Sequence, residues 1–142
     1  LQRDLPTKLR SKLTNYLFEK FVTNNEGSFS KELYLSFDEI NEMRESDMYF
    51  GSHGYSHEWL SYLLENQLRT EIRKSLDFYY KINKSMDNLI MCHPYGNYSD
   101  KTIEELKKEG FKAGLTTEVG DAVLTKSNAF TLKRYDTNDF PQ

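Results

Sequence analysis

Two histidines four residues apart, His53 and His57, are the residues whose type and spacing most directly suggest chemistry. Neutral imidazole is the commonest nitrogen ligand of zinc and related ions, and a pair spaced i, i+4 can reach one ion from a turn leading into a helix. Catalytic zinc normally has three protein ligands and a water, so a further ligand would have to come from elsewhere. The same spacing also occurs by chance, and both histidines could instead be structural or solvent-exposed.

The segment "HPYG", residues 93–96, is the second candidate for chemistry. Pro94 fixes a turn after a short apolar run, and Gly96 permits a backbone angle that other residues avoid. We therefore expect the backbone N–H of Tyr95 to face the site, where it could donate to a developing oxyanion. His93 could be a third metal ligand, although a packed histidine is the favoured interpretation. An ordinary proline–glycine loop would also account for this segment.

Apolar spacing predicts the elements that must position these two segments. Apolar residues recur every three or four positions in the expected helices, and short apolar runs between turn signals mark the expected strands. Ser36 and Glu39 form a capping box, Ser99 caps a later helix and Gly110 ends it. The expected helices cover residues 6–23, 37–46, 60–82 and 100–109, and the expected strands cover 48–52, 89–92, 112–116 and 130–134.

This order of elements predicts an α/β fold with right-handed crossovers and a mainly parallel sheet. In such folds, functional sites lie at the carboxyl ends of the strands. The histidine segment and the "HPYG" segment both follow strands that should be neighbours. Polar groups from the two segments should therefore converge on one edge of the sheet.

The composition is that of a globular protein with no nucleic-acid partner. Of the 142 residues, 37% are hydrophobic and 29% charged, and the net charge of -3 gives no electrostatic reason to expect nucleic acid or an anionic membrane. The apolar runs are far shorter than the roughly 20 residues that cross a bilayer, and no signal-peptide pattern opens the chain. The single cysteine, Cys92, forms no internal disulfide. The sequence leaves the location open and leans toward the cytoplasm.

Two quoted segments together resemble a known family. "GSHGYSH", residues 51–57, and "HPYG", with one long helix between them, resemble the second and third motifs of the polysaccharide deacetylases. These are the carbohydrate esterases of family four, which share the NodB-like homology domain. "EGFKAGLTTEVGDA", residues 109–122, and "TLKRYDTND", residues 131–139, resemble later segments of the family, so the resemblance spans about residues 33–140.

The resemblance implies a partial, distorted (β/α) barrel that carries a metal-dependent deacetylase of N- or O-acetylated polysaccharides or sugars. By analogy His53 and His57 would bind the metal, with zinc favoured and cobalt or nickel acceptable. The backbone N–H of Tyr95 would bind the oxyanion, and Pro94 and Gly96 would line the substrate site beside it. A metal-activated water would attack the acetyl carbonyl.

The sequence departs from the family in its first motif. Thr-Phe-Asp-Asp-Gly, which supplies the general base and the third metal ligand, does not occur in this sequence. Asp38, in "LSFDEI", is a substitute in principle, but its segment is better explained by the capping box. Gly54 also replaces the usual serine or threonine of the second motif, and Cys92 stands where the third often has arginine.

The late Leu-x-His motif, whose histidine acts as general acid, is also missing. Arg134 and Asp136 are candidates for its place, as in more distant relatives. Asp121 and Asp139 are further candidate polar residues because both lie in expected loops. Trp59 and the ten tyrosines could stack on sugar rings, although core positions are expected for most of them.

We therefore expect residues 1–142 to form a single domain, the C-terminal part of a polysaccharide deacetylase domain. Residues 1–30 would be a helical lead-in, and residues 31–142 would carry the motifs on βα units. With the aspartate motif outside this sequence, the chain alone should be a poor catalyst, should bind zinc weakly and could form a homo-oligomer that covers the open sheet. Two alternatives are a catalytically inactive sugar-binding or scaffold module of the same fold and an unrelated α/β protein with chance motifs.

Overall fold

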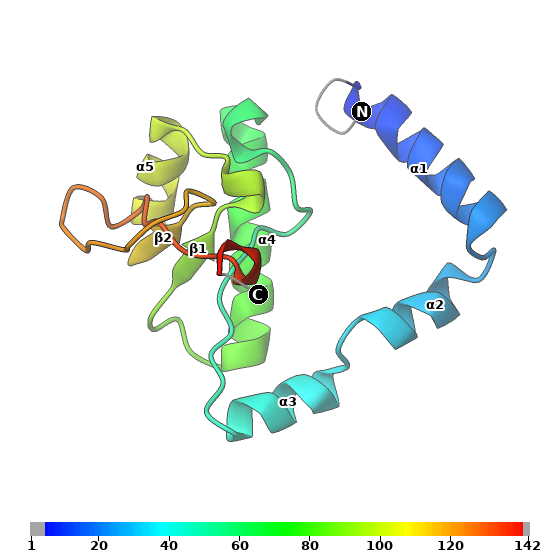
Figure 1. Ribbon diagram of the computed structural model, residues 1–142, viewed down its shortest axis with the longest axis horizontal. Coiled ribbons are helices and arrows are strands. Elements are labelled where there is room, and N and C mark those ends of the chain that lie inside the picture. Colours follow the sequence, from blue (N-terminus) through cyan, green and yellow to red (C-terminus); the bar gives the residue numbers. More distant parts are fainter. Residues whose placement is uncertain (1–4, 141–142) are drawn as a thin grey trace. The chain divides into compact units, whose positions relative to one another are not determined.

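The computed structural model describes residues 5–140, and the chain divides into two compact units between Ile40 and Asn41 (Figure 1). Each unit is described by itself. The first unit ends at residue 40, whereas the helical lead-in was expected to end at residue 30. The organisation of the whole chain as one domain stays a prediction.

The first unit is built from helices. Helix α1 spans Thr7–Phe21 and confirms the helix predicted over residues 6–23. Helix α2 spans Glu26–Leu33 and was not predicted, because residues 24–27 were interpreted only as the end of the first helix. The Asn25 side chain accepts a hydrogen bond of 3.1 Å from the N–H of Ser28 and so begins a new helix there.

Helix α3 spans Phe37–Glu45 and crosses the boundary between the units. The predicted capping box is confirmed, since the Ser36 N–H donates to the Glu39 carboxylate at 2.7 Å and the Glu39 N–H donates to the Ser36 hydroxyl at 3.2 Å. The backbone and hydroxyl donors of Ser36 hold the pKa of Glu39 below its usual value. Asp38 lies in the first turn of the helix, where the helix dipole stabilises a carboxylate.

The second unit contains the longest helix, α4, which spans Glu65–Asn83. Its predicted range of 60–82 was too long at the start, because Leu60–Tyr62 form a separate 3-10 turn, η1. Leu64 has an extended backbone, and its N–H donates to the side chain of Gln67 at 3.0 Å. Apolar spacing continues through this break, so periodicity alone could not locate it.

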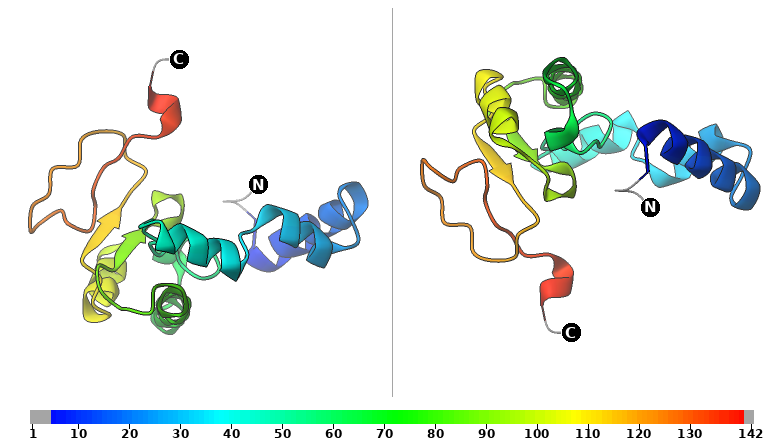
Figure 2. Two further views of the ribbon diagram at one scale, coloured as in Figure 1. Left: turned by 90° about the horizontal axis from the view of Figure 1, so that it is seen from below. Right: turned by 90° about the horizontal axis from the view of Figure 1, so that it is seen from above.

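Helix α5 spans Asp100–Lys108 and confirms the predicted helix. The Ser99 hydroxyl caps it by accepting from the N–H of Thr102 at 3.3 Å, and Gly110 follows with a left-handed backbone at φ 88°. Figure 2 shows α4 and α5 on the same face of the small sheet. The opposite face carries the long loop that follows the second strand.

The sheet is parallel, as predicted, and small. Strand β1 spans Ile90–Cys92 and pairs in parallel with strand β2, which spans Ala113–Leu115. Ser52 makes one parallel bridge to β1 on its outer side, and Leu132 makes one to β2. The two outer predicted strands are therefore reduced to single bridges, but their positions beside the inner strands are correct.

Side chains occupy hydrogen-bonding positions that longer outer strands would have used. The Tyr49 hydroxyl accepts from the N–H of Ile90 at 3.2 Å and donates to the carbonyl of Asn88 at 2.6 Å. On the other side, Nε2 of His93 lies 2.9 Å from the carbonyl oxygen of Phe130. Backbone pairing along these two edges is therefore interrupted, and sequence patterns do not report such long-range side-chain contacts.

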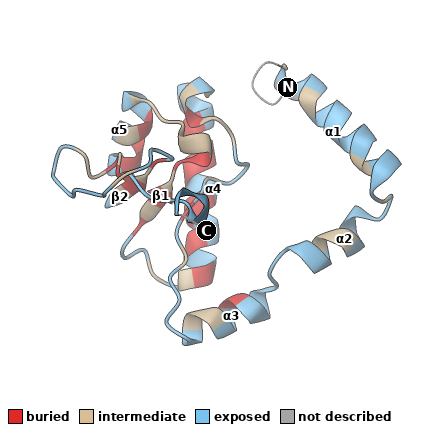
Figure 3. Ribbon diagram, in the orientation of Figure 1, coloured by how far each residue is buried: buried red, intermediate tan, exposed pale blue. Residues whose placement is uncertain are grey.

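The core of the second unit lies between the two helices and the sheet. Ile72 of α4, Met91 of β1 and Leu106 of α5 are completely buried. Figure 3 shows the buried residues on the facing sides of these elements. The core cluster consists of Leu60, Leu68, Ile72, Leu76, Tyr79, Leu89, Met91, Leu106, Phe111 and Phe130.

Helix α1 has an exposed apolar side. The leucine side chains at positions 9, 13 and 17 are each more than 40% exposed. Arg10 and Lys12 lie between the first two of them in the sequence. Across residues 5–140, no helix is both long enough and apolar enough to cross a membrane.

Candidate metal centre and oxyanion turn

The two candidate segments leave adjacent parallel elements at the same edge of the sheet. The Ser52 N–H donates to the carbonyl of Ile90 at 2.9 Å, and the Cys92 N–H donates to the carbonyl of Ser52 at 2.8 Å. His53 follows directly, and its Nδ1 lies 2.7 Å from the carbonyl oxygen of Cys92. The predicted convergence of the histidine segment with the segment after β1 is confirmed.

His53 and His57, here called the histidine pair, face each other with their Nε2 atoms 3.0 Å apart. A carbonyl oxygen only accepts, so Nδ1 of His53 carries a hydrogen, and Nε2 of the neutral ring has a free lone pair. Two lone pairs at this separation would repel each other. A proton from His57 or a cation must therefore lie between the two rings.

The pKa of His57 is lowered, first by burial and then by the nearby His53, while Glu58 acts in the opposite direction. The neutral ring is therefore favoured at neutral pH, and only a neutral imidazole binds a metal. His57 has a left-handed backbone, with φ 54°. This conformation turns its ring back toward His53, as their centroid distance of 4.7 Å shows.

The predicted turn forms a short 3-10 helix, η2, over Pro94–Gly96. Tyr95 within it has a left-handed backbone, with φ 58° and ψ 16°. The two hydrogen bonds that close the turn use the amides of Gly96 and Asn97, and not that of Tyr95. The Tyr95 ring lies 4.6 Å from the ring of His57, so the turn borders the histidine pair.

Trp59 packs against this turn. Its ring is stacked on Tyr95, with centroids 4.5 Å apart and planes within 6° of each other, and it also stacks with Tyr62 at 5.9 Å. Trp59 is half-buried, so it is neither a pure core residue nor a free platform for sugar. The stack holds the ring of a residue whose backbone conformation is unfavourable for a non-glycine residue.

Glu71 is a site residue that the sequence analysis missed. It lies on the buried face of α4, and its carboxylate accepts hydrogen bonds from the N–H groups of Tyr55 and Ser56, between the two histidines. The sequence contains a signal for a buried role of Glu71, because this residue falls between Leu68 and Ser75 on the apolar stripe of the helix. A carboxylate on a buried helix face requires a hydrogen-bonding partner.

His93 is a packed residue, which confirms the favoured interpretation. It is completely buried, and its Nε2 donates to the carbonyl of Phe130. Its Nδ1 is buried and has no hydrogen-bonding partner among the described residues. Burial lowers the pKa of His93, the hydrogen bond to Phe130 partly opposes this, and the charge of His53 adds to the lowering.

Acid should therefore destabilise the folded chain through His93. Its pKa in the folded state is below the ordinary value of 6.5, so the unfolded chain binds the proton more readily. The stabilisation is complete above about pH 6.5 and is lost as the pH falls through the lowered folded pKa. Urea unfolding between pH 7.5 and 5 should show a weaker pH dependence for His93→Gln than for the unchanged protein; equal slopes would contradict this role.

Arg134 follows the segment that bridges β2 at Leu132. Its N–H donates to the carbonyl of Glu118 at 3.0 Å. Burial raises the pKa of the Cys92 thiol, and the positive charge of Arg134 partly opposes that shift. Arg134 is therefore close enough to act electrostatically on the Cys92 side chain.

Asp136 and Asp139 make local contacts instead. Asp136 caps the 3-10 helix η3, Thr137–Asp139, by accepting from the N–H of Asn138 at 3.0 Å, and this contact lowers its pKa. The Asp139 carboxylate accepts from the N–H of Asp136 at 2.7 Å. Within the described residues, no hydrogen bond or ion pair joins either carboxylate to the histidine pair.

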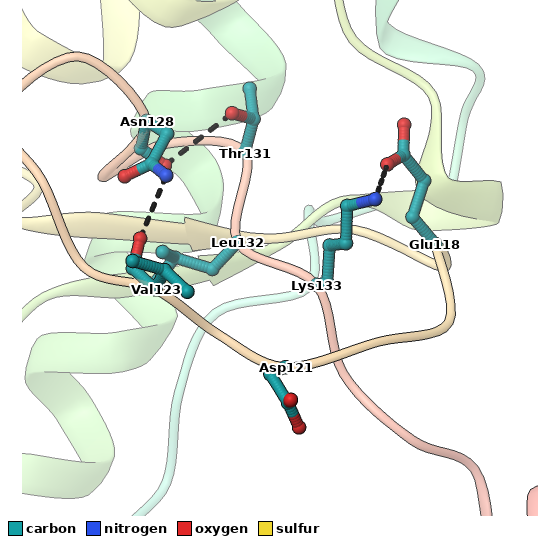
Figure 4. Close-up of a pocket in the computed structure, with 7 residues that line it drawn as sticks. All are labelled: Glu118, Asp121, Val123, Asn128, Thr131, Leu132 and Lys133. Atoms are coloured by element: carbon teal, nitrogen blue, oxygen red, sulfur yellow. Dashed lines mark hydrogen bonds and ion pairs between the residues drawn. The ribbon is translucent and has the colours of Figure 1, made fainter.

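Asp121 lines a separate pocket of about 280 Å³ in the loop after β2 (Figure 4). An ion pair of 3.3 Å between Lys133 and Glu118 lies at one side of this pocket. The Asp121 carboxylate accepts from the Tyr135 hydroxyl at 3.1 Å. The lining residues are Glu118, Asp121, Val123, Asn128, Thr131, Leu132 and Lys133, so this pocket does not include the histidine pair.

The histidine pair fits two of the positions that a divalent metal requires. The carbonyl of Cys92 fixes the His53 tautomer that leaves Nε2 available, which is the usual outer contact of a metal-binding histidine. Over residues 5–140, no group of three histidine, cysteine, aspartate or glutamate side chains is placed to hold one ion. A third ligand is therefore not provided by the described residues in this arrangement.

Comparison with known proteins gives the same family as the motifs. The family model described as "Polysaccharide deacetylase" matches residues 5–114, which include the histidine pair and η2. YxkH of Bacillus subtilis (strain 168), assigned by its name to the polysaccharide deacetylases, is 28% identical over 101 residues. The alignment covers 67% of this chain and 34% of YxkH.

Solved structures have the same fold. The Streptococcus pyogenes deacetylase PplD, in complex with acetate, matches with a TM-score of 0.65 and 26% identity over 70% of this chain and 43% of PplD. The deacetylase domain of BpsB from Bordetella bronchiseptica matches with a TM-score of 0.52 and 16% identity over 71% of this chain and 50% of that domain, and shows the fold alone. The chain thus spans about a third of YxkH and less than half of PplD. With a family model matching well over half of its residues, this chain belongs to the polysaccharide deacetylase family.

Proposed function

We propose that this chain is part of a metal-dependent deacetylase that hydrolyses N- or O-acetyl groups of a polysaccharide or a smaller sugar. The observation that carries the proposal is the pair of Nε2 atoms 3.0 Å apart, bordered by the Tyr95 turn at the carboxyl end of β1. Membership of the family supports the reaction class. Acetylated carbohydrate would be the partner, and no nucleic acid would be bound.

His53 and His57 would hold the ion through Nε2, with zinc favoured by the nitrogen ligands and cobalt or nickel also acceptable. When bound, such an ion supplies Lewis acidity and lowers the pKa of a water molecule. The Cys92 carbonyl keeps His53 in the tautomer that can bind. The Tyr95 N–H, which does not close its own turn, would donate to the oxyanion of the acetyl group, and Pro94 and Gly96 would shape the surface beside it.

The general base and the third ligand would come from outside the described residues, so the chain alone would be impaired. Arg134 and Asp136 are proposed, with less support, for the region of the late motif. Residues 1–142 would then be the C-terminal part of a partial (β/α) barrel. The short sheet, whose outer segments make only single bridges, would be covered by the rest of the barrel or by a second copy.

A catalytically inactive sugar-binding or scaffold module is the second candidate. One observation favours it, namely that the described residues do not place three metal-ligating side chains together. In such a module the histidine pair would share a proton and serve only to join the two segments. Its fold would be the same, so metal content and catalysis separate the two candidates.

The test uses the protein in the longest form that its gene encodes. Purified protein should contain a stoichiometric divalent metal and should release acetate from acetylated oligosaccharides. Removal of the metal with a chelator should stop the release, and zinc should restore it. A protein that contains no stoichiometric metal and releases no acetate would favour the inactive module.

A further inference from the structure

Glu71 is a buried carboxylate that does not belong to the expected catalytic motifs. It is only 7% exposed, and it lies among the apolar side chains of the core-facing side of α4. A buried charge is unfavourable unless strong hydrogen bonds compensate for lost hydration. The observed compensation is specific, because one oxygen of Glu71 accepts from two consecutive backbone amides, those of Tyr55 and Ser56.

The loop that donates these bonds has an unusual backbone. Gly54 and His57 both have left-handed conformations, with φ 77° and 54°. The amides bonded to Glu71 lie between them, in the middle of the segment that joins the two histidines. Hydrogen bonds to an ionised acceptor are about twice as strong as neutral ones, so a charged anchor is well suited to hold this segment.

The loop also packs closely against the Glu71 carboxylate. A side chain at Gly54 would place its Cβ 3.3 Å from the Glu71 carboxylate and 3.4 Å from Pro94. One helical turn farther along α4, the hydroxyl of Ser75 accepts a hydrogen bond of 3.1 Å from Ser52, the residue before His53. Helix α4 therefore holds the segment both before His53 and between the two histidines.

We propose that Glu71 is the positioning residue of the histidine pair. Its carboxylate fixes the loop amides and thereby sets the separation of the two Nε2 atoms at a distance that one ion can bridge; the interpretation as a metal site rests on the proposed function. Glu71 acts through the backbone, because the oxygen that accepts from the two amides is directed at the loop. Its negative charge also favours a cation nearby.

The test compares Glu71→Gln and Glu71→Ala with Glu105→Gln. Glutamine keeps an acceptor but removes the charge, whereas alanine removes both. Glu105 is the matched control, since it is also a buried carboxylate, 5% exposed, but lies on α5 and pairs with Arg69 at 3.0 Å and Lys108 at 3.5 Å. Cobalt(II) affinity is measured from its visible absorption, and the Tm is measured on the same samples.

Cobalt(II) affinity should fall about 10–100-fold in Glu71→Ala and less in Glu71→Gln, as for other residues that orient metal-binding histidines. Glu105→Gln should lower the Tm and leave the affinity within about twofold of the unchanged protein. The idea is overturned if folded Glu71→Ala and Glu71→Gln both keep the full affinity. It is equally overturned if Glu105→Gln weakens binding as much as Glu71→Ala, because the effect would then follow global stability.

A second measurement separates this inference from the proposed function. Long-range 1H–15N spectra of the metal-free protein report the tautomers of the two imidazole rings. If the unchanged protein binds no cobalt(II), the metal site is rejected, but changed 15N shifts of the His57 ring, whose Nε2 lies 3.0 Å from that of His53, in both Glu71 variants would still support the positioning role. Unchanged ring spectra in both variants would reject the positioning role, even where cobalt(II) binds.

Discussion

Replacing His57 with alanine should lower the affinity of the chain for zinc or cobalt(II) by at least about 100-fold, since even loss of an outer partner of a ligating histidine weakens binding 10–100-fold. The remaining His53 would offer a single nitrogen, and the Nε2 pair 3.0 Å apart would no longer exist. Isothermal titration with zinc, or cobalt(II) absorption, measures the loss. His53→Ala should have a similar effect.

Ser56→Ala is the control for this experiment. Ser56 lies in the same loop, and its contact with Glu71 is made by the backbone N–H, which alanine keeps. Zinc affinity should therefore be unchanged in Ser56→Ala. A His57→Ala protein that is folded and binds zinc as tightly as Ser56→Ala would show that the ion is held elsewhere.

Gly114→Ala should be the most destabilising small substitution in the sheet. Its Cβ would lie 2.5 Å from the carbonyl oxygen of Phe130 and 2.7 Å from Nε2 of His93. The first of these atoms belongs to the backbone and the second to a fully buried ring, so neither can move aside easily. The free energy of unfolding should fall by about 3 kcal/mol, the upper end of the range for overpacking a core.

Gly51→Ala provides the comparison. Its Cβ would come no closer than 3.2 Å to any neighbour, and that neighbour is the side chain of Tyr49. Urea unfolding should show a much smaller loss of stability for Gly51→Ala than for Gly114→Ala. Equal losses would mean that the contact with Phe130 and His93 relaxes without difficulty.

Local sequence signals were sufficient for most helices. The strict spacing of apolar residues gave α4 and α5, and the reciprocal contacts of Ser36 and Glu39 formed as expected. Helix α2 was missed because Asn25 suits both the end of one helix and the start of the next. The break before α4 was missed because Leu63 and Leu64 continue the apolar pattern while their backbones are extended.

The two segments of the site could be predicted from the sequence, but the residue that holds them in place could not. The histidine pair and the turn at Tyr95 could be found because each combines reactive residue types with turn-forming neighbours. Their proximity followed from the parallel order of the elements, which the bridge at Ser52 confirms. The contacts of Glu71 with Tyr55 and Ser56 could not be predicted from the sequence. They join residues that are 16 and 15 positions apart, and they depend on how α4 packs.

His57 and Tyr95 have left-handed backbones, although neither is glycine. For such residues this conformation is unfavourable by roughly 1–2 kcal/mol, so glycine or asparagine at either position would improve the fold. Engineering this protein for heat resistance alone would therefore tend to select a change at His57, whose side chain the proposed reaction needs, whereas glycine or asparagine at position 95 would keep the backbone N–H. Variants chosen only for a higher melting point should be screened for retention of His57.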